Sequence, residues 1–197
     1  AQIRLMEHLR NHAGERSMVV LRPADGEETI SAWRLALEEK RPVALILSRQ
    51  NIKNLPALAA SRREEAAQVA KGGYVVLDSA KPEVVMVATG SEVSTLVEGA
   101  SLLAAEGIAV RVVNVPSEGL FRDQPHSYQE SVLPAGIARY GMTSGLPVTL
   151  QGLVGEKGFI HGHDMFGFSA PYTVLDKEFG YNGETVAAEV KKLLGRA

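Results

Sequence analysis

The sequence predicts an α/β protein, because short apolar strands alternate with amphipathic helices along most of the chain. The alternation is clearest over residues 83–197, which predict a three-layer α/β/α sandwich around a mostly parallel sheet. Residues 1–56 show only an α-β-α-β order, and two strands with two helices bury too little apolar surface to form a domain. We therefore expect an incomplete α/β unit over 1–56, a linker over 57–82 and one complete domain.

The composition is that of an ordinary globular protein, with 197 residues, 45% of them hydrophobic and 22% charged. A net charge of −2 argues against nucleic acid or an anionic membrane as the main partner. The sequence has no cysteine, which excludes disulfides, thiolate metal sites and cysteine catalysis. No apolar run is long enough to span a bilayer and the first residues contain no signal-peptide core, so we expect a cytoplasmic location.

The first unit begins with a helix and continues into a strand over residues 17–22. The apolar stripe of the helix consists of Ile3, Met6 and Leu9, and Gly14 should end the helix. A second helix should begin after Asp25, because the acids that follow suit a helix N-terminus. Its inner, core-facing stripe is predicted to be Ile30, Trp33 and Leu37.

The run Val43–Leu47 then predicts a buried strand that ends on Ser48-Arg49-Gln50-Asn51. The carboxyl ends of strands are where open α/β sheets bind ligands. The guanidinium of Arg49 offers five donors in a fixed geometry that matches phosphate or carboxylate. The residues leave two interpretations open, a ligand-binding arginine and a structural arginine that pairs with a nearby acid.

Residues 57–73 suit a partly helical connection, and Tyr74–Leu77 follows as a short strand within the linker. The clearest pattern is a βαβ unit, with strands at Val84–Ala88 and Ala109–Val115 around one helix. Thr89 and Glu92 have capping-box spacing at the start of that helix, which explains the turn without a bound anion.

The remaining elements are less regular. We expect a loop over 116–123, a short helix over 128–133, a strand over 136–140, an irregular segment over 146–154, a strand over 158–161 and helices over 172–179 and 184–194. Between the last strand and these helices, His161, His163 and Asp164 are close in sequence, which could suggest a metal site. No fourth ligand and no glutamate base accompany them, so we assign no metal ligand here.

Five stretches together resemble the transketolase family. They are Leu21-Arg-Pro-Ala-Asp, Ala44-Leu-Ile-Leu-Ser-Arg-Gln-Asn, Ala88-Thr-Gly-Ser-Glu-Val, Ser131-Val-Leu-Pro and Phe166-Gly-Phe-Ser-Ala-Pro. They follow the family's order and cover nearly the whole chain, and the second together with the third is the most specific signal. Deoxyxylulose phosphate synthases and the β chains of 2-oxo acid dehydrogenases share the architecture but fit the first run less well.

The resemblance implies a parent enzyme of three α/β domains, a homodimer that uses thiamine diphosphate and magnesium. Such an enzyme transfers a two-carbon ketol group between phosphosugars in the pentose phosphate pathway. This sequence resembles the end of the pyrimidine-binding domain (1–56), a linker (57–82) and the transketolase C-terminal domain (83–197).

The resemblance also implies one site residue: Arg49 matches the arginine that binds the phosphate of the sugar substrate. No catalytic, cofactor-binding or metal-binding residue can be assigned, because the family's Gly-Asp-Gly motif is absent and Ala24-Asp25-Gly26 is a turn. The catalytic glutamate of the family belongs to a region that precedes the matched segment. We therefore expect the isolated chain to be inactive. The alternatives are a non-catalytic assembly subunit of a split transketolase, or a C-terminal portion of a related enzyme such as deoxyxylulose phosphate synthase.

Overall fold

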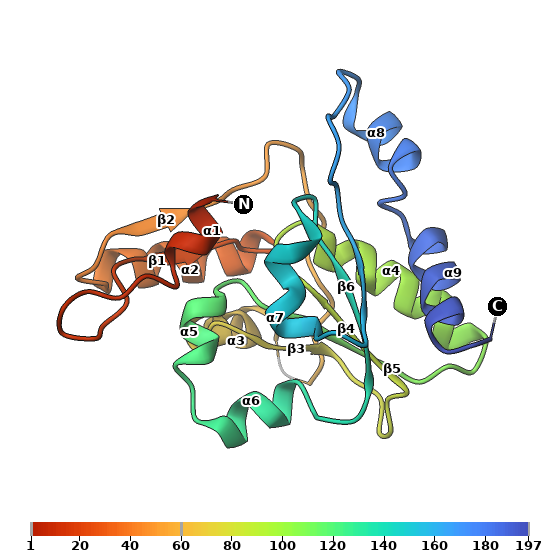
Figure 1. Ribbon diagram of the computed structural model, residues 1–197, viewed down its shortest axis with the longest axis horizontal. Helices are drawn as coiled ribbons and strands as arrows, with labels where there is room; N and C mark the ends of the chain where they lie inside the picture. The colour runs from red at the N-terminus through yellow and green to blue at the C-terminus, as the bar shows by residue number, and fades with distance from the viewer. Residues whose placement is uncertain (1, 60, 197) are drawn as a thin grey trace.

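The computed structural model describes residues 2–59 and 61–196 and shows two α/β parts joined by a short helical connection (Figure 1). The first part comprises α1 (Gln2–Met6), β1 (Val19–Leu21), α2 (Gly26–Glu38) and β2 (Val43–Leu45). The connection contains α3 (Arg62–Ala66) and the 3-10 helix η1 (Ala67–Lys71). Within the described ranges, no helix is both long and apolar enough to cross a membrane.

The first part is a two-stranded parallel sheet with α2 as its crossover helix. Val19 lies opposite Val43, and the two strands run in register to Leu21 and Leu45. Helix α2 begins after Asp25, whose carboxylate accepts a hydrogen bond from the backbone N–H of Glu28 at 2.8 Å. The predicted start of α2 and the α-β-α-β order are therefore confirmed. Strand β2 is shorter than predicted and only half-buried.

The predicted inner stripe of α2 was wrong. Ile30, Trp33 and Leu37 are 55%, 51% and 81% exposed, whereas Glu28 and Ala32 on the other side of the helix are buried. The reason is that α2 packs its Glu28 side against α3 and η1, where the guanidinium of Arg62 donates a hydrogen bond to the Glu28 carboxylate. An apolar face of α2 is therefore left uncovered.

The expected first helix is also shorter and rotated relative to the prediction. It ends at Met6 rather than at Gly14, and its apolar side chains Ile3 and Met6 are exposed. Glu7 is buried instead, because its carboxylate accepts hydrogen bonds from the Ser117 hydroxyl at 3.0 Å and from a backbone N–H at 2.9 Å. A buried acid with two donors thus determines which side of the segment faces the protein.

The second part is built on a five-stranded sheet. Its strands are β3 (Tyr74–Leu77), β4 (Val84–Ala88), β5 (Val110–Asn114), β6 (Ala138–Met142) and β7 (Phe159–His161). They lie in the order β3-β5-β4-β6-β7, and every neighbouring pair is parallel except β3 with β5. The predicted mostly parallel sheet is confirmed. Residues 74–77, expected in the linker, instead form the antiparallel edge strand of this sheet.

Helices cover both faces of the sheet, as the three-layer prediction requires. The second part contains α4 (Glu92–Ala105), α5 (Glu118–Arg122), α6 (His126–Val132), η2 (Pro147–Leu150), α7 (Gln151–Val154), α8 (Tyr172–Glu178) and α9 (Gly183–Leu193). Alternate residues of β4 enter two separate apolar clusters: Val84 and Met86 join the cluster of α4 and α9, and Val85 and Val87 join that of α5, α6 and α7. Helix α5 lies in a predicted loop, and η2 with α7 lies in a predicted irregular segment.

A buried network of charged and polar side chains joins the two parts. Arg62, from the connection, donates to Asp25 at 2.6 Å and to Glu28 at 2.5 Å, and both carboxylates are completely buried. Tyr74 in β3 and Asn114 in β5 also donate to Glu28, the latter to both of its oxygens at 2.7 and 2.8 Å. Burial raises the pKa of Glu28, and the guanidinium of Arg62 opposes this effect. The network connects α2 to the edge of the large sheet.

We expect the substitution Arg62→Leu to lower the free energy of unfolding by about 3–5 kcal/mol, because it leaves two buried carboxylates without their cation. Urea denaturation followed by circular dichroism measures the change. Arg63→Leu is the matched control, since Arg63 is the adjacent, exposed arginine on the same helix and should change stability by less than about 0.5 kcal/mol. Equal losses for the two variants would show that the network does not hold the two parts together.

Candidate functional site

An open groove of about 630 Å³ lies between the loop that follows β2, the start of α4 and the region of α8. The loop from Ile46 to Lys53 forms one wall, and Arg22 at the end of β1 lies beside it. Ser91, Ser94 and Thr95 in and before the first turn of α4 contribute hydroxyl groups. The groove therefore combines cations, the carboxylates of Glu92, Glu98 and Asp176, and neutral hydrogen-bonding groups. It lies at the carboxyl ends of β1 and β2, which is the edge where such sheets bind ligands.

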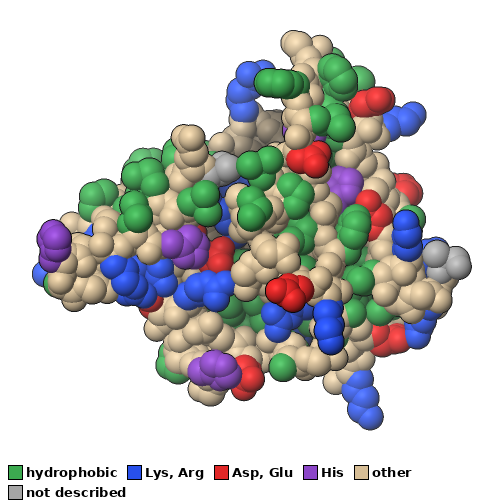
Figure 2. All heavy atoms as spheres, in the orientation of Figure 1, with side chains coloured by type: hydrophobic (Ala, Val, Ile, Leu, Met, Phe, Trp, Pro, Cys, Tyr) green, Lys and Arg blue, Asp and Glu red, His purple; other side chains and the backbone are tan. Residues whose placement is uncertain are grey.

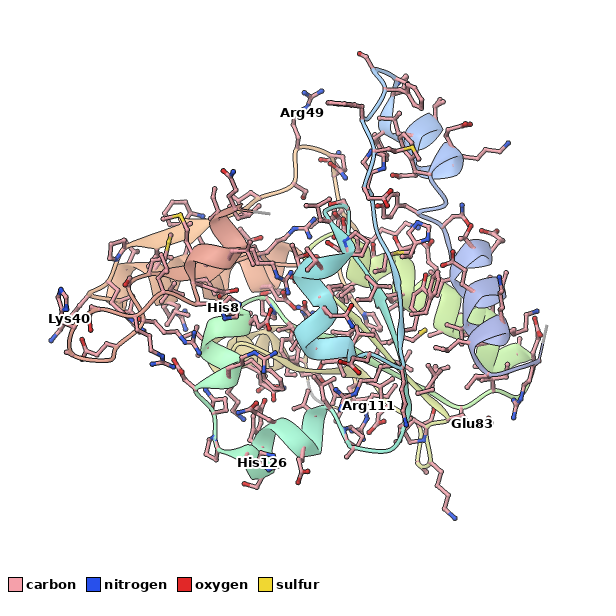
Figure 3. The ribbon with its side chains drawn as sticks, in the orientation of Figure 1. His8, Lys40, Arg49, Glu83, Arg111 and His126 are labelled. Atoms are coloured by element: carbon pink, nitrogen blue, oxygen red, sulfur yellow. The ribbon has the colours of Figure 1, made fainter. Side chains whose placement is uncertain are left out.

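Arg49 lies at this groove as the strand-end arginine that the sequence indicated. Its side chain is exposed, and Figure 3 shows it at the outer end of the loop after β2, directed away from the body of the molecule. Over residues 2–59 and 61–196, the structure shows no hydrogen bond or ion pair of Arg49. The structural interpretation, in which Arg49 pairs with a nearby acid, is therefore not observed, and its guanidinium is available to a ligand.

The two other cations in the groove are already paired. Lys53 lies 3.0 Å from Glu98, and Arg22 lies 2.8 Å from Glu92. Glu92 is buried, and Arg22 also donates to the Ser144 hydroxyl at 3.1 Å. Arg49 differs from both in having no acidic partner among the described residues, so an anion entering the groove meets no competing carboxylate on it.

The predicted capping box at the start of α4 was wrong. The residue before α4 is Ser91, and no side chain caps the helix there. The Thr89 hydroxyl donates instead to the backbone carbonyl of Arg22 at 3.4 Å, and Glu92 accepts from the guanidinium of Arg22. Because Glu92 pairs with Arg22, its carboxylate does not cap the helix. Gly90 allows this close approach, because a Cβ there would lie 2.7 Å from the Nε of Arg22.

The His161-Gly-His163-Asp164 stretch has structural contacts. The ring nitrogens of His161 lie within hydrogen-bond distance of the Glu189 carboxylate and the backbone carbonyl of Phe179. The ring of His163 packs edge-on against the ring of Phe179 at a centroid distance of 4.5 Å. Both ring nitrogens of His161 are thus occupied by protein partners, and only His163 lines the groove.

Among the described residues, one group of side chains is compact enough to be tested as a metal site: Glu7, His8 and Glu118. Glu118 already pairs with Arg122 at 2.8 Å and lies 3.6 Å from Arg4. Burial raises the pKa of Glu7, which disfavours its charged form. Magnesium prefers charged oxygen ligands in a nearly octahedral arrangement, and two neighbouring guanidinium groups do not fit such a site. These residues also lie outside the groove of Arg49.

Comparisons with known proteins agree with this two-part organisation. Residues 1–54 match the family model of the transketolase pyrimidine-binding domain. Residues 72–182 match that of the transketolase-like C-terminal domain. The chain belongs to the transketolase family. It corresponds to the C-terminal portion of these enzymes, as the sequence resemblance implied.

Individual relatives support the same assignment. A transketolase of Geobacillus stearothermophilus is 40% identical over 195 residues, which cover 97% of this chain and 29% of the relative. A transketolase structure from Pichia stipitis, in complex with sedoheptulose 7-phosphate, is 34% identical with a TM-score of 0.78, covering 93% of this chain and 26% of that one. A split-gene transketolase solved as an inactive β4 tetramer is 25% identical with a TM-score of 0.68, covering 98% of this chain and 61% of that one. The chain thus spans less than a third of the two full-length relatives.

The sequence located Arg49, but it did not reveal the groove around it. Arg22 and Glu92 are 70 positions apart, and neither residue carries a local signal that would identify the other as its partner. The hydroxyls of Ser94 and Thr95 lie in the first turn of α4, and no motif in the sequence marks them as part of a site. A sequence pattern can mark a strand end, but not the side chains that another part of the fold places across from it.

We expect the two arginines of the groove to differ in their effect on stability. Arg22→Gln should lower the free energy of unfolding by about 1–3 kcal/mol, because the buried Glu92 loses its charged partner. Arg49→Gln should change it by less than about 0.5 kcal/mol, because it removes an exposed side chain that has no partner in the described part of the chain. Urea titrations of both variants give the comparison. A large loss for Arg49→Gln would reveal a structural role that the contacts do not show.

Proposed function

We propose that this chain supplies the sugar-phosphate contact of a longer transketolase, which transfers a two-carbon ketol group between phosphosugars. The observation that carries the proposal is the guanidinium of Arg49 at the carboxyl end of β2, which is exposed and has no partner within residues 2–59 and 61–196. A guanidinium donates two parallel hydrogen bonds to a phosphate group. Each charge-assisted hydrogen bond of this kind contributes roughly 1.5–3 kcal/mol. The phosphosugar bound in the Pichia stipitis relative supports the substrate class.

The uncovered face of α2 supports a longer parent enzyme. Trp33 and Leu37 border a groove of about 480 Å³ that also contains Val43 and Leu45 of β2. A parallel sheet is normally covered on both faces, and its strands lie within a larger sheet. We propose that another portion of the pyrimidine-binding domain covers this face in the parent enzyme.

The regions of the parent enzyme that this chain does not match would bring the groups that hold thiamine diphosphate and magnesium. The cofactor supplies stabilisation of a carbanion on the transferred fragment. In this chain, Arg49 would bind and orient the phosphate end of the sugar, away from the reacting carbons. The isolated chain is therefore proposed to be inactive. The homodimeric assembly and the cytoplasmic location of the parent stay predictions.

A second candidate function is a non-catalytic assembly subunit that pairs with a separate N-terminal chain. The split-gene relative is the observation behind this alternative: 98% of this chain aligns with 61% of that subunit. In this case the uncovered α2 face would be a permanent docking surface. A portion of a related enzyme such as deoxyxylulose phosphate synthase is the remaining alternative, and its weaker fit to the first sequence run argues against it.

We expect the purified chain to show no turnover with xylulose 5-phosphate, ribose 5-phosphate, thiamine diphosphate and magnesium. A chimera in which this chain replaces the matching 29% of the Geobacillus stearothermophilus enzyme should be active, because the missing portion is restored. A coupled assay for the triose phosphate product measures both. Turnover by the chain alone would contradict the proposed inactivity, and a folded chimera that binds cofactor but stays inactive would contradict the proposed function.

In that chimera, Arg49→Gln should reduce kcat/KM for phosphosugars by about 10- to 100-fold, mainly through KM, which corresponds to one lost charge-assisted contact. Arg34→Gln, which changes another exposed arginine of the same part, is the control and should leave the kinetics unchanged. An acceptor aldehyde without phosphate should react equally with both variants. A uniform loss of kcat with every substrate would show that Arg49 does not act on the phosphate.

A further inference from the structure

Residues 162–178 form an arm that leaves the sheet after β7 and returns just before α9. The arm contains α8 and projects from the body of the molecule at the top of Figure 1. Figure 2 shows hydrophobic side chains on this projection. Its large exposed side chains are Met165, Phe166, Phe168, Tyr172 and Val174. An arm with so little burial depends on contacts at its base to keep its position.

His161 connects the two ends of the arm at its base. His161 is the last residue of β7, and Phe179 follows α8, so the two residues bracket the arm. The Nε2 atom of His161 lies 2.9 Å from the backbone carbonyl oxygen of Phe179. Its Nδ1 atom lies 3.1 Å from each carboxylate oxygen of Glu189 in α9. The imidazole thus bridges the start of the arm, its end and the last helix.

Both partners of the ring accept hydrogen bonds, and this determines the charge that the ring needs. A neutral imidazole has one N–H and can serve only one of two acceptors, whereas an imidazolium donates from both nitrogens. A carbonyl oxygen has no proton to give. Glu189 itself accepts from the Tyr140 hydroxyl at 2.7 Å. Burial alone would raise the pKa of Glu189, but the bonds from His161 and Tyr140 lower it, so the carboxylate is ionised.

We propose that protonated His161 is a pH-dependent latch that closes the base of the arm formed by residues 162–178. Loss of one ring proton breaks the hydrogen bond from the ring to either the Glu189 carboxylate or the Phe179 carbonyl, so the ring then holds the base of the arm by one partner instead of two. The rings of His163 and Phe168 pack on Phe179, so release of Phe179 also loosens these contacts.

Among the titratable groups around His161, the imidazole is the one whose ordinary pKa lies nearest to neutral pH. Tyr181 packs edge-on against its ring at 5.0 Å, and burial raises the pKa of Tyr181 to about 12. The pKa of Tyr140 is also raised by burial, so both phenols stay neutral. On α9, Glu189 faces the ring, and the positive charge of Lys192 acts on Glu189. The bond to Glu189 raises the pKa of His161 above its ordinary value.

The direction of the pH effect follows from that raised pKa. In the unfolded chain, His161 titrates near 6.5. The stabilisation by the latch is fully present below that pH, and it is lost as the pH rises through the higher pKa of the folded state. The arm should therefore open more often in mildly alkaline solution than in neutral solution.

Two measurements on the full chain test the latch. Long-range ¹H–¹⁵N spectra report the protonation of each histidine, and we expect both nitrogens of His161 to be protonated at about pH 7, with release above the ordinary histidine value of about 6.5. Limited proteolysis within the arm should become faster between about pH 7 and about pH 9, several-fold more than at other exposed sites. A neutral His161 at pH 7, or cleavage that does not depend on pH, would overturn the proposal.

Variants separate the latch from a general loss of stability. Glu189→Gln keeps the size of the side chain but removes the negative charge, so it should lower the pKa of His161 and shift the rise in arm cleavage to lower pH. His161→Gln should make arm cleavage fast at every pH. His126→Gln, which removes an exposed histidine on α6, is the control and should leave the cleavage profile unchanged. An unchanged profile for Glu189→Gln would overturn the proposal even if His161→Gln fails to fold.

Discussion

The arrangement of the two parts depends on one largely buried cation, Arg62, between Asp25 and Glu28. Two carboxylates without solvent would repel each other and favour protonation, and the guanidinium is what allows both to be buried. Tyr74 and Asn114 extend this contact to the edge of the large sheet. The side of α2 that faces inwards is therefore selected by charge rather than by apolar area, and this is why its apolar stripe faces outwards.

The same pattern recurs along the boundary between the two parts. Glu7 bonds to Ser117 and to the backbone of α5, and Arg22 bonds to Glu92 in α4. At each place a charged side chain of the first part finds its partner in the second. Such contacts are directional, so they fix the orientation of the parts more strictly than apolar packing alone. The groove of Arg49 owes its shape to this fixed orientation, because its walls come from both parts.

The sequence predicted the elements whose burial follows from local periodicity. The strand Val84–Ala88 is apolar at every position, and it became the central strand with both faces covered. The sequence did not predict the burial of Glu28, because the partners of this carboxylate lie 34, 46 and 86 positions away along the chain. The position of Arg49 after β2 was predictable because the apolar run before it marks the strand, as the apolar run of β4 does. The prediction that Glu92 caps α4 was wrong, because the distant Arg22 donates to its carboxylate.

The exposed face of α2 has a practical consequence through Trp33. It is the only tryptophan of the sequence, and half of its surface is open to solvent on this face. The emission of an indole depends on the polarity around it. The tryptophan fluorescence of this protein therefore reports whether the exposed face of α2 is in contact with solvent or covered by another molecule. Binding of another molecule over this face of α2 will therefore change the tryptophan fluorescence, so it can be followed without a label and without a mutation.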